Sequence, residues 1–165
     1  MRRAIDSLDR RSLFALAGFL IICFAVAALG GAVTRTAIDG WYAGLQKPFF
    51  APPNWLFGPV WTVLFALMAV AAWRIWRSRG DTVARRRALS AFAVQLALNC
   101  AWPFAFFGGR SPVLGLLVIV TLAAAILWTV ITFARLDPRA AWLMAPYAAW
   151  VAFAAVLNLG IVALN

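Results

Sequence analysis

Five long apolar runs constrain this chain more than any other feature. Each is about as long as the roughly 20 apolar residues that a helix needs to cross the ~30 Å hydrocarbon core of a bilayer. They cover residues 13–33, 55–76, 89–107, 112–134 and 141–164. The composition agrees, because 65% of the residues are hydrophobic and only 12% are charged. The sequence therefore predicts an all-α integral membrane protein, with a single five-helix transmembrane domain over residues 13–165 and a short tail over residues 1–12.

The first run has one alternative interpretation. A basic segment before an apolar stretch also describes a signal peptide, and residues 1–12 carry four arginines. The apolar stretch that follows, residues 13–33, is nevertheless long enough to span the bilayer. We therefore interpret it as the first transmembrane helix.

The distribution of Lys and Arg predicts the orientation of the five spans. Residues 1–12, 74–87 and 135–139 carry four, six and two basic side chains, whereas the opposite side receives only Arg35, Lys47 and Arg110. Cytoplasmic segments are enriched in basic residues. The expected topology places the N-terminus in the cytoplasm and the C-terminus outside. We expect the plasma or inner membrane of a bacterium.

The charge of the chain does not indicate a nucleic-acid partner. A formal net charge of +10 is compatible with such binding, but the arginines here punctuate apolar runs instead of covering a solvated face. The triplet Arg85, Arg86 and Arg87 is more simply a determinant of topology that meets anionic lipid headgroups.

The apolar runs lack the groups that several chemistries need. They contain no acidic residue and no histidine, which argues against a proton-coupled pump, a catalytic triad or a metal site. Cys23 and Cys100 lie inside apolar runs without metal-ligand spacing, so we expect buried free thiols. We predict no catalytic residue, no metal ligand and no required cofactor.

The stretch at residues 41–61, WYAGLQKPFFAPPNWLFGPVW, is unusual for a loop. It holds three tryptophans, four prolines and the only lysine of the chain. Four prolines prevent one uninterrupted helix, since proline lacks the amide donor and clashes with the preceding turn. We expect a structured loop over residues 34–54, shaped by Pro48, Pro52 and Pro53, before the second helix begins near Trp55.

Three motifs carry a resemblance to a known family. They are WY..L.KP...PP.W.F..VW at residues 41–61, QLALN..W...FFG at 95–108 and PY..W...A..LN at 146–158. In this order and in spans two, three and five, they resemble the tryptophan-rich translocator proteins, the TspO or peripheral-type benzodiazepine receptor family. That resemblance implies a five-helix bundle, often a homodimer, which binds porphyrins, haem, sterols and other hydrophobic molecules near the first loop.

The resemblance also implies which residues form the site. The implied ligand-binding residues are Tyr42, Trp61, Phe65, Asn99, Trp102, Trp150 and Ala154. The implied lid residues are Trp41, Lys47, Pro48, Pro52, Pro53 and Trp55. The propionates of a tetrapyrrole would seek donors near the interface, such as Lys47, Arg35 or an indole N–H.

Helical spacing supports such a site from the residues alone. Trp61 and Phe65 are four residues apart, as are Trp150 and Ala154, and Asn99 and Trp102 are three apart. Residues at these spacings project from one face of a helix, so three faces can converge on one cavity. Ala154 is the small member that leaves room for a ligand.

Some of these residues have a simpler interpretation. The tryptophans near predicted span ends can serve as interfacial anchors instead of ligand contacts. These are Trp41, Trp55, Trp73, Trp76 and Trp142. Asn99 can bridge two helices, as buried amides do in bilayers.

Two departures from the family pattern affect the expected ligand. No Lys or Arg follows Arg139, so Tyr147 cannot complete a C-terminal sterol-recognition pattern. Val118 stands where the family often has an acidic residue in the fourth helix. The leading hypothesis is a receptor or translocator for porphyrin-type tetrapyrroles. The alternatives are light- or oxygen-dependent porphyrin degradation by tryptophans, and a dimeric lipid-binding scaffold.

Overall fold

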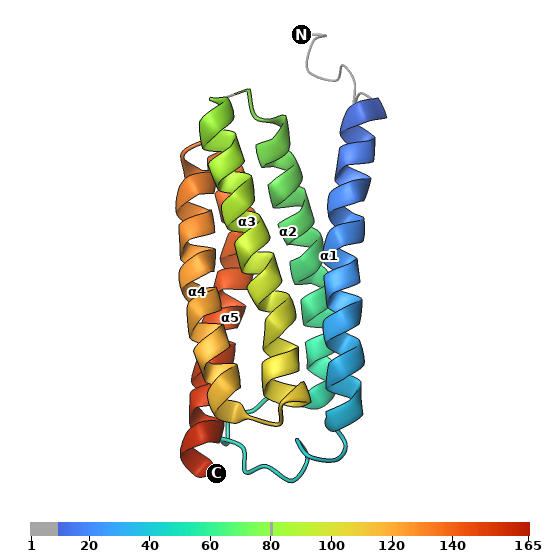
Figure 1. The fold of residues 1–165 in the computed structure, drawn as a ribbon, viewed down its shortest axis with the longest axis vertical. Coiled ribbons are helices and arrows are strands. Elements are labelled where there is room, and N and C mark those ends of the chain that lie inside the picture. Colours follow the sequence, from blue (N-terminus) through green and yellow to red (C-terminus); the bar gives the residue numbers. More distant parts are fainter. Residues whose placement is uncertain (1–9, 80) are drawn as a thin grey trace.

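The computed structural model describes residues 10–79 and 81–165, and it confirms the predicted all-α fold with five helices long and apolar enough to cross a membrane. The helices are α1 (Arg10–Ala37), α2 (Phe57–Arg77), α3 (Thr82–Pro103), α4 (Pro112–Ala134) and α5 (Pro138–Leu164). They form one elongated bundle in which α1 begins at one end and α5 finishes at the other (Figure 1). Residues 1–9 of the predicted tail lie outside the described residues.

Capping side chains place two helix starts before the apolar runs at residues 89–107 and 141–164. Asp81 accepts hydrogen bonds from the amides of Val83 and Ala84, at 3.0 and 3.3 Å, and so starts α3 at Thr82. Asp137 accepts one from the Arg139 amide at 3.0 Å and starts α5 at Pro138. A carboxylate at this position satisfies amides that have no partner within the helix.

The five helices form a closed ring. Along this ring, α1 lies between α2 and α3, α5 contacts α2 and α4, and α4 contacts α3. Two short irregular turns lie at the end of the bundle that carries the loop between α1 and α2. A 3-10 turn, Asn54–Leu56, leads into α2, and a π-helical turn, Phe104–Gly108, finishes α3 after Pro103.

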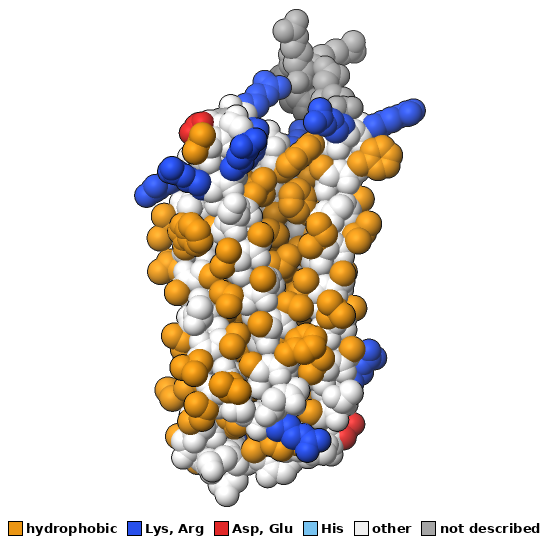
Figure 2. All heavy atoms as spheres, in the orientation of Figure 1, with side chains coloured by type: hydrophobic (Ala, Val, Ile, Leu, Met, Phe, Trp, Pro, Cys, Tyr) orange, Lys and Arg blue, Asp and Glu red, His pale blue; other side chains and the backbone are white. Residues whose placement is uncertain are grey.

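The two ends of the bundle differ in charge. The arginine-rich end is the one where α2 and α4 finish and α3 and α5 start, and it carries Arg74–Arg87 and Arg135–Arg139. The loop end carries Arg35, Lys47 and Arg110. Figure 2 shows apolar side chains over the flank of the bundle and most Lys and Arg side chains near its upper end. At the arginine-rich end, Arg74 and Asp137 form an ion pair of 2.8 Å between α2 and the start of α5.

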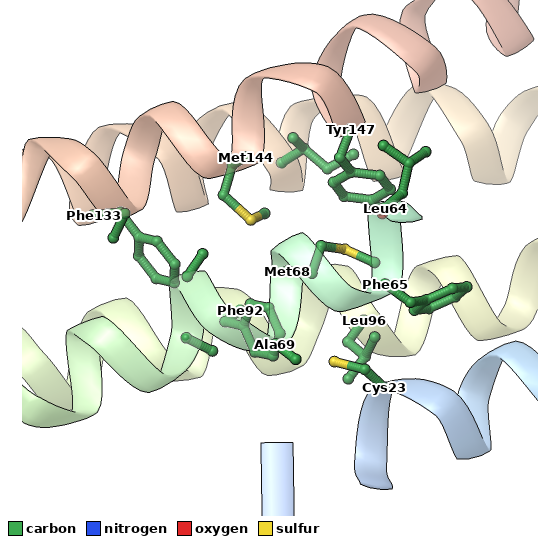
Figure 3. Close-up of a cluster of buried hydrophobic side chains, with 14 of the residues drawn as sticks. Cys23, Leu64, Phe65, Met68, Ala69, Phe92, Leu96, Phe133, Met144 and Tyr147 are labelled. Atoms are coloured by element: carbon green, nitrogen blue, oxygen red, sulfur yellow. The ribbon is translucent and has the colours of Figure 1, made fainter. Parts of the chain in front are cut away.

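The middle of the ring is filled in the half next to the arginine-rich end. Met68 of α2 and Met144 of α5 are fully buried there, and Phe92 of α3 stacks on Phe133 of α4 with ring centroids 6.2 Å apart (Figure 3). Burial of these side chains removes apolar surface from contact with lipid and closes the ring. The half next to the loop has a smaller buried cluster, which includes Tyr42, Phe106 and Leu157.

Candidate ligand cavity

A cavity of about 540 Å³ occupies the loop half of the bundle, and all five helices contribute to its wall. Its volume falls in the range of small-molecule pockets, roughly 300–1,000 Å³. The structure brings all seven ligand-binding residues implied by the resemblance to this one wall. They are Tyr42, Trp61, Phe65, Asn99, Trp102, Trp150 and Ala154. Their contact with a ligand remains a prediction.

Aromatic pairs give the wall its shape. Trp102 stacks on Phe106 with centroids 5.2 Å apart and planes at 21°. Trp150 meets Phe57 edge to face at 5.9 Å, which joins α5 to the start of α2. Such packed rings have little freedom to turn, so the wall presents fixed apolar faces.

Three polar atoms of the wall have no partner. The indole nitrogens of Trp102 and Trp150 and the Oδ1 atom of Asn158 are buried without a hydrogen bond to any described residue. The amide of Asn158 already donates from Nδ2 to the Pro112 carbonyl at 2.8 Å, which leaves Oδ1 as a free acceptor. Buried polar groups are normally paired, so three unpaired atoms on residues that line the cavity are unusual. Gln95 Nε2 is also buried without a partner among the described residues, although Gln95 does not line the cavity.

Sequence reasoning missed Asn158 as a site residue. The signal was present, because Asn158 ends the third motif and follows Ala154 by four residues on the same helix face. Its bond to Pro112, however, depends on how closely α4 approaches α5, which the sequence does not show.

Asn99 has the placement expected for a ligand-binding residue and also for a bridge between two helices. It lines the cavity, and its Nδ2 donates to the Tyr147 hydroxyl at 2.9 Å. The Tyr147 hydroxyl in turn donates to Gln95 Oε1 at 2.9 Å. This buried chain joins α3 to α5 and fixes the floor of the cavity, where the Tyr147 ring lies 6.2 Å from that of Trp61.

We expect Tyr147→Phe to lower stability by about 1–2 kcal/mol, because it leaves Asn99 and Gln95 without their shared partner in an apolar interior. Thermal unfolding in detergent micelles measures this loss. Tyr42→Phe is the matched control, since the Tyr42 hydroxyl makes no hydrogen bond within the described residues. Equal shifts for the two variants would contradict a stabilising role for the chain of hydrogen bonds.

The first half of the loop closes the cavity at the loop end. Tyr42 is buried there against Phe107 and Phe106, with centroids 5.5 and 6.1 Å away. Burial raises the pKa of the Tyr42 phenol above its ordinary value, so it is neutral at physiological pH. Lys47 lies over the outer face of this ring, with Nζ 4.7 Å from the centroid, and donates to the Leu45 carbonyl at 3.2 Å.

The second half of the loop is fastened along the end of α5. The backbone of Gln46 and the side chain of Asn165 exchange two hydrogen bonds of 3.0 Å. Pro48 lies so close to Gly160 that a Cβ added at Gly160 would be 2.5 Å from its Cγ atom. Of the implied lid residues Trp41, Lys47, Pro48, Pro52, Pro53 and Trp55, none lines the cavity; Ile38, Tyr42 and Asn54 do so from this segment.

Two of the remaining tryptophans have the placement of interfacial anchors. Trp55 and Trp142 lie near opposite ends of the bundle and expose 72% and 77% of their surface. Trp73 instead fastens α1 to α2, because its indole donates to the Ser12 carbonyl at 2.9 Å.

The fold and the cavity define a class of protein: a five-helix membrane protein with an aromatic cavity under a structured loop. Residues 19–164 match the sequence profile of the TspO/MBR family. Because this match covers most of the chain, the chain belongs to the TspO/MBR family.

Similar proteins occur in prokaryotes and animals. The chain is 37% identical to the tryptophan-rich protein TspO of Archaeoglobus fulgidus, over 91% of this chain and 96% of the relative. It is 40% identical to the human translocator protein, over 72% of this chain and 70% of the relative. It is 35% identical to the tryptophan-rich sensory protein of Cereibacter sphaeroides, over 89% of each chain.

Proposed function

We propose that this protein is a membrane receptor or translocator that binds porphyrin-type tetrapyrroles, such as protoporphyrin or haem, in the cavity. The observation that carries the proposal is a cavity of about 540 Å³ with a mostly apolar, aromatic wall, whose lining residues Trp102, Trp150 and Asn158 have unpaired polar atoms. A flat apolar ligand that carries a few polar groups complements such a wall.

The chemistry of the wall matches a tetrapyrrole in three ways. The faces of the macrocycle are large and apolar, and Trp61, Trp102 and Trp150 offer rings for stacking. The Trp102 and Trp150 indoles can donate to a carboxylate. Arg35, the one charged side chain on the wall in the described part of the chain, pairs with a propionate.

We expect purified protein to bind protoporphyrin IX with saturable quenching of tryptophan fluorescence. Trp150→Phe should weaken binding about tenfold, because it removes a hydrogen bond worth roughly 1–1.5 kcal/mol. Trp142→Phe is the matched control, since Trp142 lies on the same helix but is exposed outside the cavity. Non-saturable quenching, or equal affinities for the two variants, would contradict the proposal.

We also propose that the arginine-rich end faces the cytoplasm of a bacterium and that the loop faces away from it. The excess of basic side chains at one end supports this orientation. A reporter enzyme that folds only outside the cytoplasm, fused after Asn165, should be active. The same reporter inserted after Arg79, in the turn between α2 and α3, should be inactive. The reverse pattern would overturn the orientation.

A further inference from the structure

The exposed part of the cavity lining lies on α1 and on residues 54–62. The lining residues on α3, α4 and α5 are all buried or half-buried. The exposed lining residues are Phe24, Ala28, Gly31 and Arg35 on α1, Asn54 on the turn before α2, and Gly58 and Thr62 on α2. The opening therefore lies between α1 and α2, in the loop half of the bundle.

Small side chains keep this opening clear. Gly31 follows Ala28 by three residues and Gly58 precedes Thr62 by four, so each pair lies on one face of its helix. A Cβ atom added at Gly31 or Gly58 would have no neighbouring atom within 4 Å. We call this gap, lined by Ala28, Gly31, Arg35, Gly58 and Thr62, the α1–α2 slit.

The first half of the loop covers the loop end of the cavity, although Asn54 at the end of the loop is exposed. Tyr42 is only 5% exposed and packs on Phe106 and Phe107, which are also buried. Beyond it, the Gln46 backbone is fastened to Asn165 by two hydrogen bonds. A ligand that passed beneath the loop would have to break these contacts. No hydrogen bond joins the slit residues of α1 to those of α2 in the described part of the chain, since the hydroxyls of Thr34 and Thr62 bond within their own helices.

The slit lies near the end of α1, where a membrane-spanning helix is expected to reach the headgroups. Arg35 lies two residues before the end of α1 at Ala37, in its last turn. Long basic side chains near helix ends extend toward the headgroup region. Ala28, Gly31 and Gly58 lie on helices whose outer surfaces are apolar. A molecule that crosses the slit thus meets a basic group at its edge and no other charge.

We propose that the cavity exchanges its ligand directly with the bilayer through the α1–α2 slit, and that the ligand is an anionic amphiphile whose acidic group stays at Arg35. This inference rests on the proposed function and adds the route and the charge of the ligand. The apolar body of such a molecule passes from lipid to cavity without entering water. Its anionic group remains at the headgroup level throughout, paired with the guanidinium.

The test compares two ways of blocking exchange, both in a Cys23→Ala/Cys100→Ala background reconstituted in lipid vesicles. Gly31→Leu with Gly58→Leu narrows the slit, and leucine suits a helix better than glycine does. Pro48→Cys with Gly160→Cys locks the loop to α5, because a Cβ at Gly160 would lie 3.5 Å from the Cβ of residue 48, within the range of a disulfide. Gly18→Leu is the control for a leucine on α1 that meets open space away from the cavity.

Stopped-flow fluorescence with protoporphyrin IX measures association and dissociation. We expect the two leucines to slow both rate constants about tenfold or more, as a narrowed passage does, and the loop disulfide and Gly18→Leu to leave them unchanged. The proposal would be overturned if the disulfide slowed exchange, a reductant restored it, and the leucines at residues 31 and 58 had no effect. Equal slowing by Gly18→Leu would also overturn it.

Arg35→Gln tests the pairing of Arg35 with an acidic group of the ligand, independently of the route into the cavity. It should weaken the binding of protoporphyrin IX more than that of its uncharged dimethyl ester, and Arg110→Gln at the same end should affect neither. An equal loss for both porphyrins would overturn the assignment of the acidic group to Arg35.

A second readout does not depend on porphyrin affinity. Ala154→Cys places a thiol on the cavity wall, and the rate at which N-ethylmaleimide added to the vesicles modifies this thiol reports access to the cavity. We expect Gly31→Leu with Gly58→Leu to slow the modification of this thiol. The disulfide between Pro48→Cys and Gly160→Cys, formed before the reagent is added, should not change its rate. If only the disulfide between residues 48 and 160 slowed the modification, the α1–α2 slit would not be the route into the cavity, whether or not protoporphyrin binds. A protein that shows the expected labelling but no saturable porphyrin binding would contradict the proposed ligand and leave the slit supported.

Discussion

Ala154→Phe is expected to lower the affinity for protoporphyrin IX roughly a hundredfold, which corresponds to about 2.7 kcal/mol. Ala154 lines the cavity from α5, on the same helix face as Trp150 and Asn158. A phenyl ring there fills space that the ligand needs and comes between it and the unpaired atoms of those two residues. Equilibrium titration of tryptophan fluorescence measures the loss.

Ala152→Phe is the matched control for this effect. It adds the same ring to the same helix, but Ala152 is exposed and does not line the cavity. Its affinity should equal that of the unmodified protein. If Ala154→Phe bound protoporphyrin as tightly as Ala152→Phe, the ligand would have to bind elsewhere.

Gly115→Val is expected to lower the free energy of unfolding by about 3 kcal/mol through overpacking, which is more than the loss expected for Tyr147→Phe. A Cβ at Gly115 would lie 2.5 Å from the Cδ2 atom of Phe106 and 3.0 Å from Asn158 Oδ1. Relief requires movement of Phe106, which stacks on Trp102 and therefore shapes the cavity wall. Thermal unfolding in detergent and protoporphyrin titration should both show the damage.

Gly18→Val tests whether the effect comes from crowding or from valine in a helix. Gly18 also lies in a helix, but a Cβ there would meet no neighbour within 4 Å. We expect its thermal midpoint to stay near that of the unmodified protein. A fall as large as that of Gly115→Val would show that the close approach of α4 to the π-helical turn is unimportant.

The number and type of the helices could be predicted because a bilayer demands long apolar runs. The helix ends could not, since they depend on groups outside those runs. Asp81 and Asp137 start α3 and α5 in polar sequence, and a count of apolar residues does not register a capping carboxylate. The π-helical turn after Pro103 packs against α4, where Phe106 lies close to Gly115, and the apolar count does not show this contact.

The site could be predicted in part. Helical spacing and family motifs indicated which residues share a face, and those faces meet at one cavity. The hydrogen-bonding state of the wall was not predictable, because it depends on contacts such as that of Asn158 with Pro112. Lys47, named with Arg35 as a donor for an acidic group, instead lies over Tyr42 and bonds to loop carbonyls.

The cavity in the loop half would link the lifetime of the protein to the supply of the proposed ligand. Met68, Phe92 and Phe133 pack the middle at the arginine-rich end, whereas the loop half surrounds a cavity. A molecule that occupies the cavity supplies the contacts that side chains do not, and binding to the folded state alone adds about 2.7 kcal/mol at a hundredfold excess over Kd. Proteases that act on opened helices would therefore degrade the empty protein first, so its abundance in the cell would follow the amount of ligand in the membrane.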